Sequence, residues 1–290
     1  MKMTQSTADN NTAQAELWNG DLGRKWADEQ DGLDNMLAPL GFVGIAKANF
    51  RPGETVFDIG CGCGDTSLAI AEKIRPGGQV LGVDISAPML ERAQTRAAAS
   101  GAGNAAFMLA DASTYPFAPA SADAVFSRFG VMFFADPTVA FANIRTALKP
   151  GGRACLVVWR PLTENPWVMK SLMIAAKHVV MPAPLGPEDP GPFSFGDPAR
   201  VTRILEAAGF TNVKLEPQEM LITIGAGRDL NGAVDFLMGI VPAIRMILEE
   251  QTPELREKII EEIREALAAD FGPEGLRMGT ATWIVTATNK

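Results

Sequence analysis

The chain has 290 residues, of which 26 are Lys or Arg and 34 are Asp or Glu, which gives a formal net charge of −8. Hydrophobic residues make up 47% of the sequence and charged residues 21%, a profile that indicates a packed globular protein and excludes a disordered one. The acidic balance, with no clustered run of Lys and Arg, argues against a nucleic-acid partner, because contacts to phosphates need such clusters.

The sequence has no feature of an exported or membrane-spanning protein. Residues 1–14 are polar and lack the apolar stretch of a signal peptide. The most apolar segments, 154–159 and 232–248, are too short or too interrupted to cross a bilayer. The three cysteines are too few for a disulfide framework. We therefore expect a cytoplasmic protein with no membrane span.

The first 50 residues are predicted to be helical. Apolar residues recur at helical spacing over residues 13–29 and 34–49. Gly20, Gly23 and Gly32 are expected to interrupt the helices.

The next hundred residues alternate between short apolar strands and helices. Two Gly-Gly turns, at 77–78 and 151–152, each precede a strand. Alternation with short connections predicts a parallel sheet covered by helices on both faces. The strands are expected at 54–59, 79–83, 105–109, 122–127 and 153–159, and the helices at 65–74, 88–100 and 137–148.

The regular alternation ends after residue 159. Further helices are expected at 166–180, 198–208 and 253–269, and further strands at 211–216 and 280–288. We interpret the chain as a single domain, 1–290. Its sheet core is expected at about 50–160, 198–217 and 278–290, and a helical cap is expected from 1–49, 160–197 and 218–277.

The most informative segment is 56–66, where an apolar strand leads into three alternating glycines and then a helix. Gly60, Gly62 and Gly64 allow a sharp turn and a close approach of the backbone to a ligand. The N-terminus of the following helix offers unpaired N–H groups. The spacing G-x-G-x-G differs from the G-x-G-x-x-G of dinucleotide-binding proteins. Taken alone, the pattern also fits an ordinary tight turn.

Carboxylates follow this strand and its neighbours. Asp58 lies just before the glycines, Asp84 ends the second strand and Asp111 follows the third. A carboxylate at the tip of the second strand is placed to accept hydrogen bonds from a ribose diol. The acids and the glycine loop together predict a crevice for an adenosine-containing ligand at the carboxyl edge of the sheet.

Cys61 and Cys63, inside the glycine loop, raise the alternative of a metal or redox pair. A zinc site needs about four ligands, and only Cys155 and His178 are left to complete one. We prefer to interpret these cysteines as small side chains within the loop, and we expect no metal.

The combination of motifs resembles the class I S-adenosylmethionine-dependent methyltransferases, and in particular their ubiquinone/menaquinone-biosynthesis-like small-molecule branch. The resemblance covers roughly residues 50–160, and the last two strands extend it. It implies an α/β, Rossmann-like sheet of seven strands, mostly parallel with one antiparallel strand. The matching motifs are residues 58–64, 82–86 with Met89, 109–112 and 148–152.

The resemblance also implies roles for particular residues. Gly60, Cys61, Gly62 and Gly64 would lie along the methionine part of S-adenosyl-L-methionine, with Asp58 near its ammonium group. The product would be S-adenosyl-L-homocysteine.

At the adenosine end, Asp84 would hold the ribose hydroxyls, and Ile85 and Met89 would lie against the adenine. Asp111 would contact the adenine amino group, and Ala112 would offer a backbone N–H beside it.

Ser127 and Phe129 would border the sulfonium, since they match the family's segment after the fourth strand. His178, the only histidine, is the candidate general base, although a structural role is the competing interpretation. The candidates for the substrate pocket are Trp18, Trp26, Phe129, Met132, Trp159 and His178.

These features predict transfer of a methyl group to a small molecule that is apolar or amphipathic. Two alternatives stay open: a nicotinamide-dependent oxidoreductase, and a non-catalytic protein that binds S-adenosylmethionine. Asp65 counts against the oxidoreductase, because it stands where the dinucleotide motif has its third glycine. The expected partner is the small-molecule acceptor, and a homodimer is considered.

Overall fold

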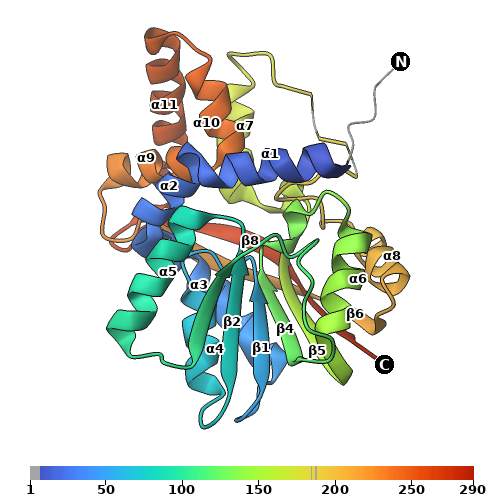
Figure 1. Ribbon diagram of the computed structural model, residues 1–290. Coiled ribbons are helices and arrows are strands. Elements are labelled where there is room, and N and C mark those ends of the chain that lie inside the picture. The colour runs from blue at the N-terminus through green and yellow to red at the C-terminus, as the bar shows by residue number, and fades with distance from the viewer. Residues whose placement is uncertain (1–6, 184, 187) are drawn as a thin grey trace, which may run out of the picture.

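A mixed β-sheet forms the centre of the fold (Figure 1). The computed structural model describes residues 7–183, 185–186 and 188–290. The strands in these residues are β1 (Thr55–Ile59), β2 (Gln79–Asp84), β3 (Ala105–Leu109), β4 (Ala122–Arg128), β5 (Leu148–Trp159), β6 (Thr211–Ile224), β7 (Phe271–Gly272) and β8 (Gly275–Thr288).

The strand order is β3-β2-β1-β4-β5-β8-β6, and the short β7 pairs with β8. The first five strands of this path run parallel to one another. β8 lies between β5 and β6 and is antiparallel to both. The predicted sheet of seven strands with one antiparallel member is therefore confirmed for the main path in the described residues.

Helices cover both faces of the sheet and its carboxyl edge (Figure 1). The face helices are α3 (Gln30–Ala48), α4 (Asp65–Lys73) and α5 (Ala87–Ser100) on one side, and α6 (Pro137–Ala147) and α8 (Pro198–Ala207) on the other. The helices above the edge are α1 (Thr7–Asn19), α2 (Asp21–Asp28), α7 (Pro166–Ala175), α9 (Leu230–Ile240), α10 (Pro242–Glu249) and α11 (Pro253–Leu267). Single 3-10 turns cover Val131–Phe133, Leu162–Glu164 and Ala268–Asp270.

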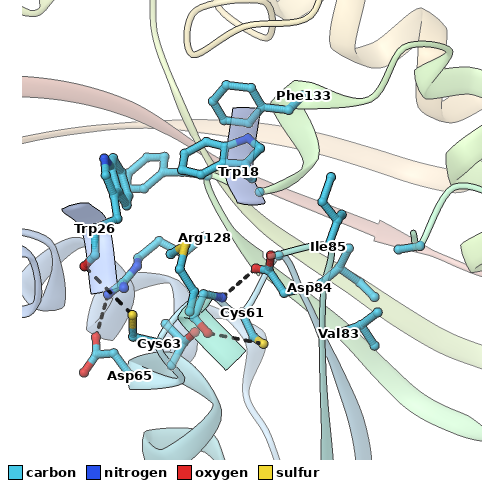
Figure 2. Close-up of a pocket in the computed structure, with 18 of the residues that line it drawn as sticks. Trp18, Trp26, Cys61, Cys63, Asp65, Val83, Asp84, Ile85, Arg128 and Phe133 are labelled. Carbon is cyan, nitrogen blue, oxygen red and sulfur yellow. Dashed lines mark hydrogen bonds and ion pairs between the residues drawn. The ribbon is translucent and has the colours of Figure 1, made fainter. Parts of the chain in front are cut away.

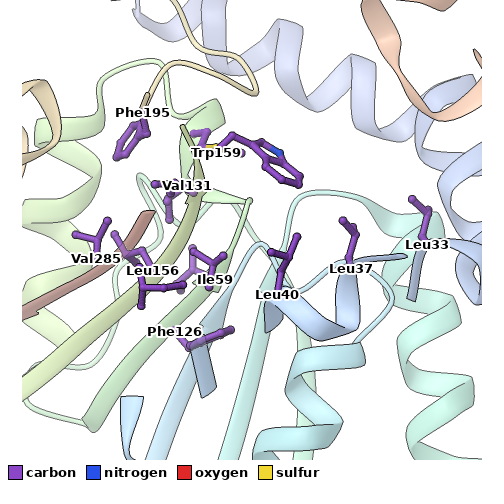
Figure 3. Close-up of a cluster of buried hydrophobic side chains, with 14 of the residues drawn as sticks. Leu33, Leu37, Leu40, Ile59, Phe126, Val131, Leu156, Trp159, Phe195 and Val285 are labelled. Carbon is purple, nitrogen blue, oxygen red and sulfur yellow. The ribbon is translucent and has the colours of Figure 1, made fainter. Parts of the chain in front are cut away.

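The apolar core explains why the central strands lack polar alternation. Four consecutive residues of β1, Val56 to Ile59, are buried, because helices cover both faces of a parallel sheet. Leu33, Leu37 and Leu40 recur at helical spacing on α3 and are buried in the apolar core (Figure 3). This packing fixes the carboxyl edge of the sheet, where the strands end, as a rigid platform.

The predicted helix breaks near the N-terminus are only partly right. Gly20 does separate α1 from α2, but Gly23 lies inside α2 and Gly32 inside α3. A Cβ on Gly32 would lie 2.8 Å from the ring of Phe236, so this glycine permits close packing and does not end the helix. The predicted helix at 166–180 ends earlier, at Ala175.

Two strands are longer than predicted. β6 continues to Ile224 and β8 begins at Gly275, so 218–224 and 275–277 are paired strands where helical cap segments were expected. β6 contains Pro217, although proline cannot donate to a sheet ladder. It is tolerated here because β6 is the edge strand of the sheet.

Among the described residues, no individual helix has the length and apolar character needed to cross a membrane. The pair α9 and α10 passes such a test when taken together, but the two helices are bent by 95° relative to each other.

Candidate active site

A cavity lies at the carboxyl ends of β1, β2, β3 and β4, between the strand tips and the helices α1 and α2 (Figure 2). Its empty space is about 1160 Å³, counting the part open to solvent. Eleven of the residues predicted from the sequence line it. They are Trp18, Trp26, Gly60, Cys61, Gly62, Asp84, Ile85, Met89, Asp111, Ala112 and Phe129.

The other predicted residues do not line this cavity. Asp58, Ser127 and Met132 are fully or almost fully buried beside it, and Trp159 is 5% exposed behind Phe129. Gly64 precedes α4, and a Cβ there would meet Ala93 and Phe107. His178 lies in the turn after α7 and is described below. The functional roles given to these residues stay predictions.

The glycine loop is held by contacts between backbones. Gly60 has φ +68°, which favours glycine, and its N–H donates to the carbonyl of Val83 at 2.8 Å. A Cβ on Gly60 would lie 2.6 Å from the Cα of Gly130, the residue that follows Phe129. The loop after β1 and the loop after β4 therefore touch through two glycines, and a side chain on either would push them apart.

Asp58 lies behind the loop and is completely buried. Its Oδ2 accepts hydrogen bonds from the hydroxyls of Thr66 at 2.7 Å and Ser67 at 2.6 Å, both on the first turn of α4. Its Oδ1 is buried with no hydrogen-bond partner among the described residues. Burial raises the pKa of Asp58 to about 6, although the two hydroxyls favour the ionised form.

This raised pKa predicts a pH dependence of stability. Between 3.8, the ordinary value, and about 6, the folded protein binds a proton that the unfolded chain releases, so this contribution to stability is lost as pH rises through 6. From pH 4 to 7, the free energy of unfolding of the wild type should fall, relative to Asp58→Asn, by up to about 3 kcal/mol. Urea unfolding at both pH values tests this, and parallel profiles for the two proteins would contradict it.

Asp84 ends β2 with both carboxylate oxygens engaged by backbone. Oδ2 accepts the N–H of Gly62 at 2.7 Å, and Oδ1 accepts the N–H of Ser86 at 2.9 Å. Burial raises the pKa of Asp84. A carboxylate has about four acceptor positions, so each oxygen can still accept a hydrogen bond from a ligand in the cavity.

Asp111 is fixed in a similar way after β3. Its Oδ1 accepts the N–H of Ser113 at 2.8 Å and the hydroxyl of the same residue at 2.6 Å. Its Oδ2 accepts the side-chain amide of Asn11, from α1, at 2.9 Å. The orientation of this carboxylate toward the cavity is thus set by both the core and the helix above it.

The wall opposite the strand tips is aromatic. The ring of Trp18, on α1, packs edge-to-face against Trp26 at 5.3 Å and Phe133 at 5.4 Å between centroids (Figure 2). Two polar contacts tie α1 down beside it. Ser86 Oγ donates to the carbonyl of Trp18 at 2.6 Å, and the Asn19 amide donates to the carbonyl of Ile85 at 2.8 Å.

Phe129 lines the cavity directly after β4 and has a constrained backbone conformation. Its φ is +65°, which non-glycine residues adopt at a cost. Its ring stacks on Trp159 with 4.0 Å between centroids and an angle of 7° between planes. The stacking and the hydrogen bond from its N–H to the carbonyl of Val157, at 2.9 Å, hold this conformation.

His178 is engaged elsewhere. Its Nε2 lies 2.9 Å from a carboxylate oxygen of Glu262 on α11, and it lies outside the cavity lining. The hydrogen bond from His178 lowers the pKa of Glu262. The contact joins the turn after α7 to α11, which fits the structural interpretation of this histidine.

The two cysteines of the loop are poor nucleophiles. Burial raises the pKa of the Cys61 thiol well above its ordinary value, and it raises that of Cys63 to about 12. Both thiols are therefore protonated near neutral pH, and thiolate is the reactive form.

Sequence reasoning missed part of the cavity wall. The missed residues come from α1, α3 and α4, from the glycine loop, and from the end of β4 and the segment after it, and most are of types that carry no signal by themselves. Among them, Arg128 and Asp65 form an ion pair. The missed lining residues include Asn11, Gln14, Gln30, Asp34, Cys63, Asp65, Thr66, Arg128, Phe133 and Phe134.

Comparison with known proteins is consistent with this geometry. Residues 56–152 match the model of a family described as a methyltransferase domain. The chain is 31% identical over 172 residues to a nocamycin O-methyltransferase of Saccharothrix syringae, covering 57% of this chain and 61% of that protein. It is 36% identical over 122 residues to a demethylmenaquinone methyltransferase of Symbiobacterium thermophilum, covering 41% and 49%. The matches thus span only about half to three-fifths of these relatives.

A solved structure has the same fold. It is phosphoethanolamine N-methyltransferase 2 of Haemonchus contortus in complex with S-adenosyl-L-methionine, with a TM-score of 0.59 and 18% identity. The alignment covers 99% of this chain and 60% of that one. From the sheet order and these similarities, we conclude that residues 56–152 match a methyltransferase domain and that the described sheet has the fold of the class I S-adenosylmethionine-dependent methyltransferases.

Proposed function

We propose that the protein transfers a methyl group from S-adenosylmethionine to a small molecule that is apolar or amphipathic. One observation carries this proposal: a single cavity combines the glycine loop, the carboxylates of Asp84 and Asp111, and an aromatic wall. The glycine loop and the two carboxylates suit an adenosine-containing cofactor, and the aromatic wall suits an apolar acceptor beside it.

The residues at the strand tips fit the adenosine part. Asp84 keeps acceptor positions for a ribose diol, and Asp111 keeps one for an exocyclic amino group. Ile85 and Met89 line the same end of the cavity with apolar groups that suit the faces of a purine. Asn11 closes this end through its bond to Asp111.

The acceptor side is apolar but not entirely so. Trp18, Phe133 and Phe134 supply ring surfaces. Gln14 and Trp26 also line the cavity, and Gln14 Oε1 and Trp26 Nε1 are buried with no hydrogen-bond partner among the described residues. Such atoms favour a ligand that brings polar groups of its own, which supports an amphipathic acceptor.

The bound cofactor would supply an activated methyl group, transferred by in-line displacement with conversion of a sulfonium to a thioether. The chain's own residues would hold the two reactants in line and exclude water, which is a large part of catalysis in such a reaction. Phe129, fixed by its stacking on Trp159, is placed to hold the reacting groups in register. The reactivity thus comes from the cofactor and the placement from the protein.

The proposal is tested by adding the enzyme and S-adenosylmethionine to a metabolite extract and searching by mass spectrometry for compounds that gain a methyl group. A methylated product that forms only with both additions supports it. Binding of S-adenosylhomocysteine without turnover across a broad panel of acceptors would point to a non-catalytic binding protein. Tighter binding of a nicotinamide nucleotide in parallel titrations would point to an oxidoreductase.

Replacement of Phe129 by alanine tests whether this side chain positions the reacting groups or binds the cofactor. In Phe129→Ala the turnover number should fall by about 10- to 100-fold, because a loosened wall misplaces the reacting groups, while affinity for S-adenosylhomocysteine changes by less than about threefold. Phe129→Leu keeps an apolar side chain of substantial size, so its turnover number should lie between those of Phe129→Ala and the wild type. Steady-state kinetics and calorimetry give the two quantities. A larger loss in affinity than in turnover would refute the placement role.

A further inference from the structure

An ion pair lines the cavity on the other side of the glycine loop from Asp84. Arg128 Nη1 donates to Asp65 Oδ2 at 2.6 Å, and the two side chains are 12% and 21% exposed. Figure 2 shows the pair on one side of Cys61 and Asp84 on the other. The groups proposed to bind the ribose and this ion pair thus lie at two ends of one cavity.

The surroundings of the pair are strongly polar. Asp65 is the first residue of α4, and the preceding Gly64 offers no side chain to cap the first N–H groups of that helix. Asp34, on α3, also lines the cavity and pairs with Arg96 at 2.6 Å. Burial and the neighbouring carboxylate of Asp65 raise the pKa of Asp34.

The balance of charge limits where a ligand's negative group can lie. The described lining contains four carboxylates, those of Asp34, Asp65, Asp84 and Asp111. Arg128 is the one cation among the described lining residues. A carboxylate entering this cavity therefore has a single cationic side chain to pair with among the described lining residues, and this side chain is already paired with an acid.

Resting on the function proposed above, we propose that the Arg128–Asp65 pair is the receptor for the amino-acid end of the cofactor. Arg128 binds the α-carboxylate, and Asp65, together with Asp34, binds the α-ammonium. When the ligand binds, its α-carboxylate takes the place of Asp65 beside Arg128, and its α-ammonium takes the place of Arg128 beside Asp65. Every charge therefore keeps an opposite charge as its partner. A guanidinium suits this task because it can donate in parallel to two carboxylate oxygens.

The two ends of the ligand can be separated experimentally. 5′-Methylthioadenosine carries the adenosine and the sulfur of S-adenosylhomocysteine but lacks the amino-acid end. In Arg128→Met, affinity for S-adenosylhomocysteine should fall by about 10- to 100-fold, while affinity for 5′-methylthioadenosine should change by less than about twofold. Asp65→Asn should show the same selectivity with a smaller loss. Calorimetric titration of both ligands against each protein measures these changes.

Control variants separate binding from general damage. Arg153→Met removes an ion pair of similar length, 2.7 Å to Glu54 at the opposite edge of the sheet, and should leave both affinities unchanged. Arg128→Lys keeps the positive charge, so it should lose less affinity for S-adenosylhomocysteine than Arg128→Met does. Thermal melting checks that each variant is folded.

Several outcomes would overturn the inference. An equal loss for both ligands in Arg128→Met would mean that the pair only supports the loop, and unchanged binding of S-adenosylhomocysteine would mean that it contacts nothing. If the wild type binds the two ligands equally well, the role of the pair fails while the proposed function stands. If the wild type binds neither, the proposed function itself fails and this inference with it.

Discussion

Replacement of Asp84 by alanine is expected to lower the affinity for S-adenosylhomocysteine by about 100-fold. The variant loses the acceptor proposed for the ribose diol. It also leaves two backbone N–H groups unpaired, those of Gly62 and Ser86, which Asp84 accepts at 2.7 and 2.9 Å. Because Gly62 belongs to the glycine loop, this one substitution disturbs both the proposed ribose contact and the loop proposed to lie along the methionine part of the cofactor. Calorimetry with wild type and variant gives the ratio of dissociation constants.

Two controls show which part of the effect belongs to the ribose contact. Asp84→Asn keeps one acceptor oxygen and should lose less affinity than the alanine variant. Asp136→Ala removes a carboxylate that accepts a backbone N–H, that of Val139 at 3.0 Å, and should leave binding unchanged. Equal affinities of the wild type and Asp84→Ala would refute the ribose role.

Gly60→Ala should be the most destabilising single change in the glycine loop. The new Cβ would lie 2.6 Å from the Cα of Gly130, and the residue would have to keep a φ of +68°. Backbone strain and overpacking together should lower the free energy of unfolding by about 2 to 6 kcal/mol. Binding of S-adenosylhomocysteine should be lost in the fraction that remains folded, since the loops after β1 and β4 must separate. Urea unfolding and calorimetry measure the two effects.

Gly151 provides the matched control. It has a φ of +76°, but nothing lies within 4 Å of the place its Cβ would take. Gly151→Ala should therefore cost only the conformational term, about 1 to 2 kcal/mol. If Gly60→Ala costs no more than this, then the contact between Gly60 and Gly130 contributes nothing to stability.

The sheet and the glycine loop were predictable because their signals are local. Buried parallel strands are continuous apolar runs, and the glycines after β1 lie where the backbone adopts positive φ angles that favour this residue type. Acids that follow successive parallel strands must meet at one edge, so the presence of Asp84 and Asp111 in one cavity followed from topology. Their roles toward a ligand stay predictions.

The rest of the site depends on contacts between distant segments. Asn11 meets Asp111 across 100 positions, and Arg128 meets Asp65 across 63, and nothing near these residues marks them as partners. The helix prediction around His178 extended too far because the apolar pattern continues beyond Ala175. Periodicity reports which face is apolar, but it does not report where tertiary packing ends a helix.

The position of β8 has a consequence for how the chain folds. This strand follows β6 in the chain but lies between β5 and β6 in the sheet, pairing with β5 over Arg153–Trp159 and with β6 over Thr211–Ile224. During synthesis, among the described strands, β6 has no partner strand and β5 is paired only with β4 until residues 275–288 have emerged. Until then the edge of β5 is open to pairing with other chains, which makes the incomplete protein prone to aggregation and makes completion of the sheet a late, long-range step.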